Sequence, residues 1–217
     1  MAKQLPYPIM REIFSRFENS EPEPKGELNH VNAYTLVVAV ALSAQATDKG
    51  VNKATETLFK TVDTPQKMLD LGEEGLIDHI KTIGLFRNKA KAIHASCCLL
   101  VEQFGGEVPR TMDELLLLRG VARKTANVVM NCAFGAETFA VDTHIFRVGN
   151  RTGMAPGKTP LEVELKLEQV VPPPYRVHAH HWLILHGRYI CKARKPECWR
   201  CPVADLCRFK PKTPPPA

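Results

Sequence analysis

Apolar residues recur every three to four positions along most of the chain, and two-residue alternation is not sustained anywhere. The first pattern gives a helix one apolar face, whereas alternation would indicate strands. The segment 34–46 is apolar nearly all round, and such a helix belongs at the centre of a bundle. The pattern therefore predicts an all-α fold.

Polar residues, prolines and glycines mark where the predicted helices begin and end. Three threonines precede a proline or lie three residues before a glutamate, as N-caps do; they are Thr64, Thr111 and Thr159. Three glycines are predicted helix ends; they are Gly72, Gly105 and Gly135. Helices are expected over 112–118 and 124–134, and the prolines at 172–174 separate two later helices.

The formal net charge of +6 and the pI near 9.0 favour an anionic partner. The basic residues concentrate in 176–212, where only Glu197 and Asp205 are acidic. The N-terminus lacks the apolar region of a secretory signal. No apolar run approaches the roughly 20 residues that a membrane helix needs. We therefore expect a cytoplasmic protein without a membrane-spanning helix, and its charge alone is compatible with a nucleic acid, a membrane surface or no specific anionic partner.

Seven cysteines in a reducing compartment argue against a disulfide framework, and an odd count is awkward for one. Cys97, Cys98 and Cys132 lie in helical apolar patterns and are expected in the core. The other four have the spacing C-x6-C-x2-C-x5-C, which indicates a soft metal; they are Cys191, Cys198, Cys201 and Cys207.

The spacing of this set favours an iron–sulfur cluster, with zinc as the alternative. Structural zinc sites typically use two close pairs of ligands, and only Cys198 and Cys201 form one. A 4Fe-4S cube suits more evenly spread cysteines. The loop after the first cysteine carries Lys192, Arg194 and Lys195, so the metal is expected to hold a basic loop against a phosphate backbone rather than to do chemistry.

A short glycine turn joins the two helices predicted around residue 120. Such a turn points backbone N–H groups outward, and the positive end of the second helix adds to them, which together make a phosphate site. The residues expected to contact the phosphate are Arg119, Gly120, Val121 and Ala122.

Two residues near this turn are candidates for catalysis. Lys124 lies in the first turn of its helix, where the helix dipole is expected to lower its pKa and partial burial near Arg123 to lower it further. Such a lysine can act as a nucleophile, whereas the alternative is a solvated lysine at a helix start. Asp142 stands where another helix begins, and a helix cap and a catalytic carboxylate are compatible roles.

Taken together, these motifs resemble the endonuclease III family, the bifunctional DNA glycosylases with a helix-hairpin-helix motif. The resemblance covers about 22–210 and is carried by the segments 42–48, 83–85, 120–127, 141–148 and 181–188 and by the four clustered cysteines. It implies a six-helix barrel over 26–136 and a cluster lobe built from 1–25 and 137–217, with the active site in the cleft between them. It also implies a 4Fe-4S cluster.

The resemblance further assigns roles to individual residues. It implies that Lys124 is the nucleophile and Asp142 the catalytic carboxylate of a glycosylase that also cleaves abasic sites. Gln45 and Leu85 would fill the gap left by the flipped nucleotide, although a polar residue at a helix end and a core residue are the alternatives. The implied substrate is duplex DNA with oxidised or ring-saturated pyrimidines or abasic sites, bound by a monomer at the bacterial nucleoid.

The chain departs from the family pattern in the hairpin, where Arg119 and Ala122 replace a proline and a second glycine. A Cβ at the phosphate contact predicts weaker DNA binding, and a positive φ at Ala122 would add strain on the order of 1 kcal/mol. Two other functions are alternatives. An adenine-specific mismatch glycosylase usually lacks the lysine and carries a further domain, and an idle DNA-binding or redox-sensing protein would not need Lys124 and Asp142.

Overall fold

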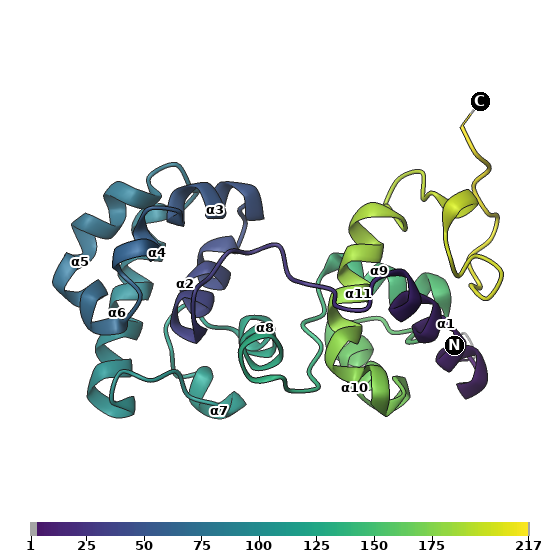
Figure 1. Ribbon diagram of the computed structural model, residues 1–217, viewed down its shortest axis with the longest axis horizontal. Coiled ribbons are helices and arrows are strands. Elements are labelled where there is room, and N and C mark those ends of the chain that lie inside the picture. Colours follow the sequence, from purple (N-terminus) through teal and green to yellow (C-terminus); the bar gives the residue numbers. More distant parts are fainter. Residues whose placement is uncertain (1–3, 217) are drawn as a thin grey trace. The chain divides into compact units, whose positions relative to one another are not determined.

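The computed structural model describes residues 4–216, and all the regular structure in this range is helical (Figure 1). The predicted all-α fold is therefore confirmed. The chain divides into two compact units, of which one is Glu27–Gly135 and the other combines Met1–Gly26 with Ala136–Ala217. None of the described helices has the length and apolar content needed to cross a membrane.

The unit Glu27–Gly135 is built around one buried helix. Its helices are α2 (Ala33–Ser43), α3 (Asp48–Thr55), α4 (Leu58–Thr61), α5 (Pro65–Ile80), α6 (Phe86–Phe104), α7 (Met112–Leu115) and α8 (Arg123–Phe134). Helix α2 packs against α3, α6 and α8, and α5 lies along α6 (Figure 1). The central helix predicted over 34–46 is confirmed, but it ends at Ser43 because Ala44 is extended and Gln45 is left-handed.

Local capping chemistry sets most helix starts. The hydroxyls of the three predicted N-cap threonines each accept a hydrogen bond from the backbone N–H three residues on, which confirms Thr64, Thr111 and Thr159. Gly105 and Gly135 end α6 and α8 in the left-handed conformation, as predicted. Gly72 has non-helical φ and ψ angles of +75° and 169° and interrupts α5, so one helical segment ends there, as predicted, and a second follows it directly.

The helix predicted over 112–118 is also shorter than expected. It ends at Leu115, and beyond it the N–H groups of Leu117 and Leu118 bond to carbonyls only three residues back. This tighter winding turns the chain toward the hairpin and leaves Leu116 and Leu117 exposed.

The second unit has an aromatic core. Its helices are α1 (Tyr7–Ser20), α9 (Thr143–Thr152), α10 (Pro160–Val170), η1 (Pro173–Tyr175), α11 (Arg176–Tyr189) and η2 (Cys198–Arg200). The ring of Phe14 on α1 lies 6.0 Å from that of Tyr175 and 6.4 Å from that of Trp182, measured between centroids. Helices α9 and α11 pack side by side (Figure 1), which brings Arg147 of α9 to Cys191 just after α11.

Candidate functional site

The four clustered cysteines line a single cavity in the second unit. They come from the end of α11, from η2 and from the turns that follow it, a segment of residues 191–207 that we call the cysteine loop. The space between them, part of it open to solvent, is about 340 Å³, and apolar side chains such as Ile190, Val203 and Phe209 complete the lining. All four are free thiols.

The donor set fits a cluster better than a single ion. Among residues 4–216, no three His, Cys, Asp or Glu side chains converge closely enough to hold one metal ion. The thiols instead surround a shared space. Burial, and then the proximity of the other three cysteines, raises the pKa of the Cys201 thiol to about 11. A multiply charged group between the thiolates, such as the irons of a cube, would offset this cost.

Arginine side chains of α9 hold the start of the cysteine loop. Arg151 donates hydrogen bonds to the carbonyl oxygens of Lys192 and Ala193, at 2.7 and 2.9 Å, and its guanidinium stacks on Phe209. Arg147 donates to the carbonyl oxygen of Cys191 at 2.8 Å. The loop therefore has a fixed backbone over its basic segment.

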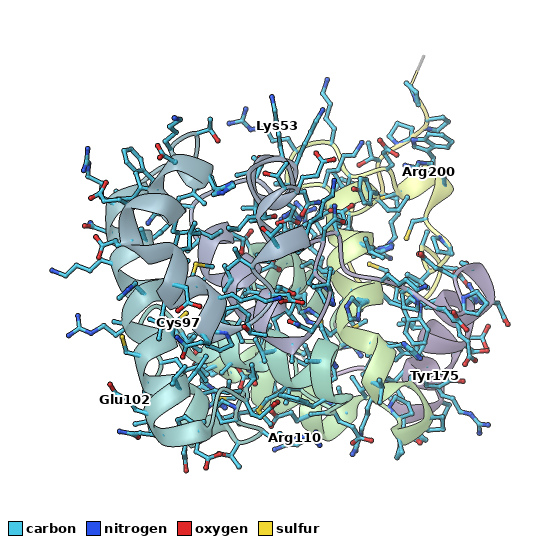
Figure 2. The ribbon with its side chains drawn as sticks, turned by 60° about the vertical axis from the view of Figure 1, so that its left-hand side comes forward. Lys53, Cys97, Glu102, Arg110, Tyr175 and Arg200 are labelled. Atoms are coloured by element: carbon cyan, nitrogen blue, oxygen red, sulfur yellow. The ribbon has the colours of Figure 1, made fainter. Side chains whose placement is uncertain are left out.

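Within that loop, one carboxylate engages two of the cations. Glu197 accepts hydrogen bonds from Lys192 and from Arg200, the labelled side chain on the C-terminal loop in Figure 2. These two partners lower the pKa of Glu197, in that order. Arg194 and Lys195 are exposed and are more available to phosphate. Lys192 is one of the DNA contacts expected from the sequence, and its pairing with Glu197 was not expected.

The hairpin between α7 and α8 is supported from below by α6. Gly120 has a φ of +82°, and a Cβ built on it would lie 3.4 Å from that of Ala92. The hydroxyl of Ser96 donates to the carbonyl oxygen of Arg119 at 2.8 Å. Val121 is buried, so any contact it makes with DNA is through its main chain. The glycine turn is thus held against α6 by this hydrogen bond and by the close approach of Gly120 to Ala92.

Ala122 is the N-cap of α8 and has a φ of −96°, which any residue adopts without strain. The strain considered for a positive φ is therefore absent. Its side chain supplies no cap, so the start of α8 lacks the hydrogen bond that an N-cap side chain would accept there. The hairpin consequently presents backbone donors of the kind that bind an anion.

Lys124 is the second residue of α8, in the first turn as predicted. Its side chain is exposed, so the partial burial expected near Arg123 is not found. It lies at the same helix start as the uncapped N–H groups, which would bring a bound phosphate close to its ammonium.

Asp142 caps α9 through one oxygen alone. Its Oδ1 accepts from the N–H groups of His144 and Ile145, both at 2.9 Å. Among the described residues, none makes a hydrogen bond or ion pair with Oδ2, and the side chain is half-buried. The cap role predicted for Asp142 is confirmed, and it leaves an oxygen for a second role.

Gln45 and Leu85 share an uncommon backbone conformation. Their φ angles are +57° and +59°, in the left-handed region that non-glycine residues rarely adopt. Leu85 is 58% exposed, so the alternative that it is a core residue is wrong. Two strained, exposed residues in one unit are candidates for contact with a ligand.

The chain matches two family models. The first describes HhH-GPD superfamily base excision DNA repair proteins and covers residues 38–173. The second describes the iron-sulfur binding domain of endonuclease III and covers 191–207, from the first to the last residue of the cysteine loop. The protein is 56% identical to endonuclease III of Rickettsia conorii, over 93% of this chain and 96% of the relative.

The chain belongs to the endonuclease III family. Endonuclease III of Escherichia coli K12 is 55% identical over 93% of this chain and 95% of its own. The fold matches a structure entitled a trapped endonuclease III-DNA covalent intermediate, with a TM-score of 0.86, 43% identity, and 94% of this chain and 97% of that chain covered. As an endonuclease III family member, the protein is a DNA glycosylase with AP-lyase activity that binds DNA and carries a 4Fe-4S cluster.

Proposed function

We propose that the protein removes oxidised or ring-saturated pyrimidines from duplex DNA and then cleaves the strand, with Lys124 as nucleophile and Asp142 as catalytic carboxylate. The observation that carries the proposal is the pairing of an exposed lysine with uncapped backbone donors at the start of α8. A backbone phosphate bound there would bring the adjoining sugar near an amine, which is the proximity that covalent catalysis requires.

The proposed reaction proceeds through a Schiff base. The deprotonated amine of Lys124 attacks C1′, the C1′–N bond breaks, and the base leaves with the electron pair and takes up a proton. Opening of the sugar ring gives an iminium ion between Nζ and C1′. Loss of a C2′ proton then expels the 3′ phosphate, and water releases the sugar fragment and regenerates the lysine.

Asp142 would assist this step with the oxygen that the helix cap does not use. Oδ2 would stabilise the positive charge that develops at C1′ or accept the proton of the Lys124 ammonium. The cap through Oδ1 holds the orientation of the carboxylate, because two backbone N–H groups donate to that one oxygen.

DNA binding is assigned to both units. The turn of Arg119, Gly120, Val121 and Ala122 would bind one phosphate through the N–H groups at the start of α8. Arg194 and Lys195 would bind another part of the backbone, and Lys192 would join them only by leaving Glu197. Gln45 and Leu85 would enter the stack where the damaged base has been flipped out.

The four cysteine-loop thiolates are the proposed ligands of the 4Fe-4S cluster, namely Cys191, Cys198, Cys201 and Cys207. When bound, the cluster supplies crosslinks between the turns of a short loop, and in this proposal it takes no part in the reaction. All the proposed site residues come from one chain, so a monomer acting on chromosomal DNA suffices.

Borohydride trapping tests the proposed function directly. A duplex with one ring-saturated pyrimidine is incubated with the protein and sodium borohydride, which reduces the iminium ion to a stable adduct. We expect an adduct with the wild type, none with Lys124→Ala, and a normal yield with Lys91→Ala, which removes an exposed lysine of the same unit. For Asp142→Asn we expect a much lower yield on the damaged base.

Other outcomes would favour other functions. Base release without an adduct would indicate a monofunctional enzyme, and release of adenine from a mismatch would indicate the adenine-specific class. An adduct that survives in Lys124→Ala would assign the nucleophile to another amine.

A further inference from the structure

Lys89 is a buried lysine in α6, only 9% exposed. Lysines are almost never buried unless their charge is satisfied by a partner. The Nζ of Lys89 donates to the carbonyl oxygen of Leu42, in the last turn of α2, at 2.8 Å. Burial lowers the pKa of this ammonium.

The partner carbonyl is one that α2 itself cannot satisfy. Ala46, which would donate to Leu42 in a longer helix, instead donates its N–H to Ser43 at 3.0 Å. The end of α2 is also the negative end of its dipole, where a cation is stabilised. The Lys89 ammonium therefore takes the place of the missing next turn of α2.

This single contact joins the two segments that carry the strained residues. Leu42 lies three residues before Gln45, and the backbone N–H of Lys89 donates to the carbonyl oxygen of Leu85 at 3.0 Å. Lys89 thus bonds to both segments. Its side chain bonds to Leu42, and its main chain bonds to Leu85. Both end residues, Gln45 and Leu85, are exposed and left-handed.

We propose that Lys89 is a positioning residue that fixes Gln45 and Leu85 relative to each other, so that both enter the duplex at the damaged site together. The proposal rests on the role in the DNA stack that the proposed function gives to those two residues. Lys89 itself touches no DNA, because it is buried beneath both segments.

The test measures the insertion of Gln45 and Leu85 into the duplex rather than the overall activity. A duplex carries a stable abasic-site analogue with 2-aminopurine as the opposite base, whose fluorescence rises when it is unstacked. Lys89→Met keeps a long side chain but removes the donor and the charge. Lys91→Met is the matched control, because it removes the same charge from an exposed position of the same helix.

We expect Lys89→Met to lose most of the fluorescence rise and to bind the duplex about ten-fold more weakly, as loss of a charge-assisted hydrogen bond suggests. Its lyase rate on an abasic site in single-stranded DNA, where no stack is entered, should stay near that of the wild type. Lys91→Met should match the wild type in both assays. Lys89→Arg keeps a charged donor of different reach and should give an intermediate fluorescence rise.

Gln45→Ala and Leu85→Ala separate failure of this inference from failure of the proposed function. If neither alters the fluorescence, the role proposed for those two residues is wrong. If either lowers it while Lys89→Met behaves like Lys91→Met, the inference about Lys89 is wrong. An equal loss on single-stranded and duplex substrates in Lys89→Met would assign Lys89 to stability alone. If Lys89→Met does not fold, the test uses Lys89→Arg instead. A full fluorescence rise and an unchanged duplex affinity in Lys89→Arg would then overturn the inference.

Discussion

Ser96 of α6 and Arg119 of the hairpin are joined by a hydrogen bond of 2.8 Å from the serine hydroxyl to the main-chain carbonyl oxygen. This bond holds the turn that presents the N–H groups of α8. We predict that Ser96→Ala lowers affinity for abasic-site duplex about three- to ten-fold, because a hydrogen bond contributes about 0.5–1.5 kcal/mol. Fluorescence anisotropy would measure this affinity. Ser96→Thr keeps the hydroxyl and should bind normally, and equal affinity of the alanine variant would contradict the prediction.

The hairpin also predicts the effect of Ala122→Gly. The φ of −96° means that the alanine is unstrained, so in the proposed complex its Cβ is what would keep the backbone from a phosphate. We expect the glycine variant to bind abasic-site duplex more tightly, by a few-fold. Glycine is also the better N-cap of the two, so α8 should not be weakened. An anisotropy titration that shows no gain in affinity would count against phosphate contact at this position.

Glu197 should weaken DNA binding because it holds Lys192 and Arg200. We predict that Glu197→Gln raises affinity and makes it more sensitive to salt, because up to two more cations become available to displace counterions. The slope of log K against log salt should steepen by about 0.9 for each added contact. Glu137→Gln, whose partner is Arg176, is the control and should leave the slope unchanged.

Cys198→Ser tests the architectural role of the cluster. Loss of one ligand should disorder the cysteine loop and so reduce DNA affinity, while the helices of Glu27–Gly135, which form their own core, remain. Iron content, circular dichroism and anisotropy at low salt would be measured on the same sample. Iron loss with unchanged affinity would show that the cluster does not organise the DNA contact.

His181 predicts a contribution to stability that depends on pH. Burial, and then the neighbouring His178, lowers its pKa to about 4. Between pH 6.5 and 4 the unfolded chain binds a proton that the folded protein does not, so this stability is present above pH 6.5 and is lost as the pH falls. At pH 5.5 the loss is up to about 1.4 kcal/mol. The fall in Tm from pH 7.5 to 5.5 should be smaller in His181→Gln, and an equal fall in both proteins would contradict the prediction.

Features set by a few neighbouring residues could be predicted from the sequence. The caps at Thr64, Thr111 and Thr159 follow from hydroxyls three residues before an N–H that needs an acceptor, and the start of α9 at Asp142 has the same origin. The motifs of the cysteine loop and of the hairpin are equally local, and they sufficed to indicate the family.

Features set by contacts between distant segments could not be predicted. Lys89 looked like any surface lysine, because its partner Leu42 lies 47 residues away. Val121 is buried and lies beside side chains of α2 and α6, which are remote in sequence. The exposure of Leu85 accompanies a left-handed backbone conformation that no local pattern encodes. The pairing of Glu197 with Lys192 joins residues only five apart, but it depends on the turns of the cysteine loop, which no regular periodicity predicts.

The approach of Gly120 to Ala92 has a consequence for how this sequence can change. Every substitution of Gly120 adds a Cβ in a left-handed conformation and brings it against α6, so the position should tolerate almost no mutation. Position 92, although in another helix and remote in sequence, should share the restriction, because a larger side chain there would lift the turn. Mutational constraint on the hairpin therefore extends to a position in the middle of another helix.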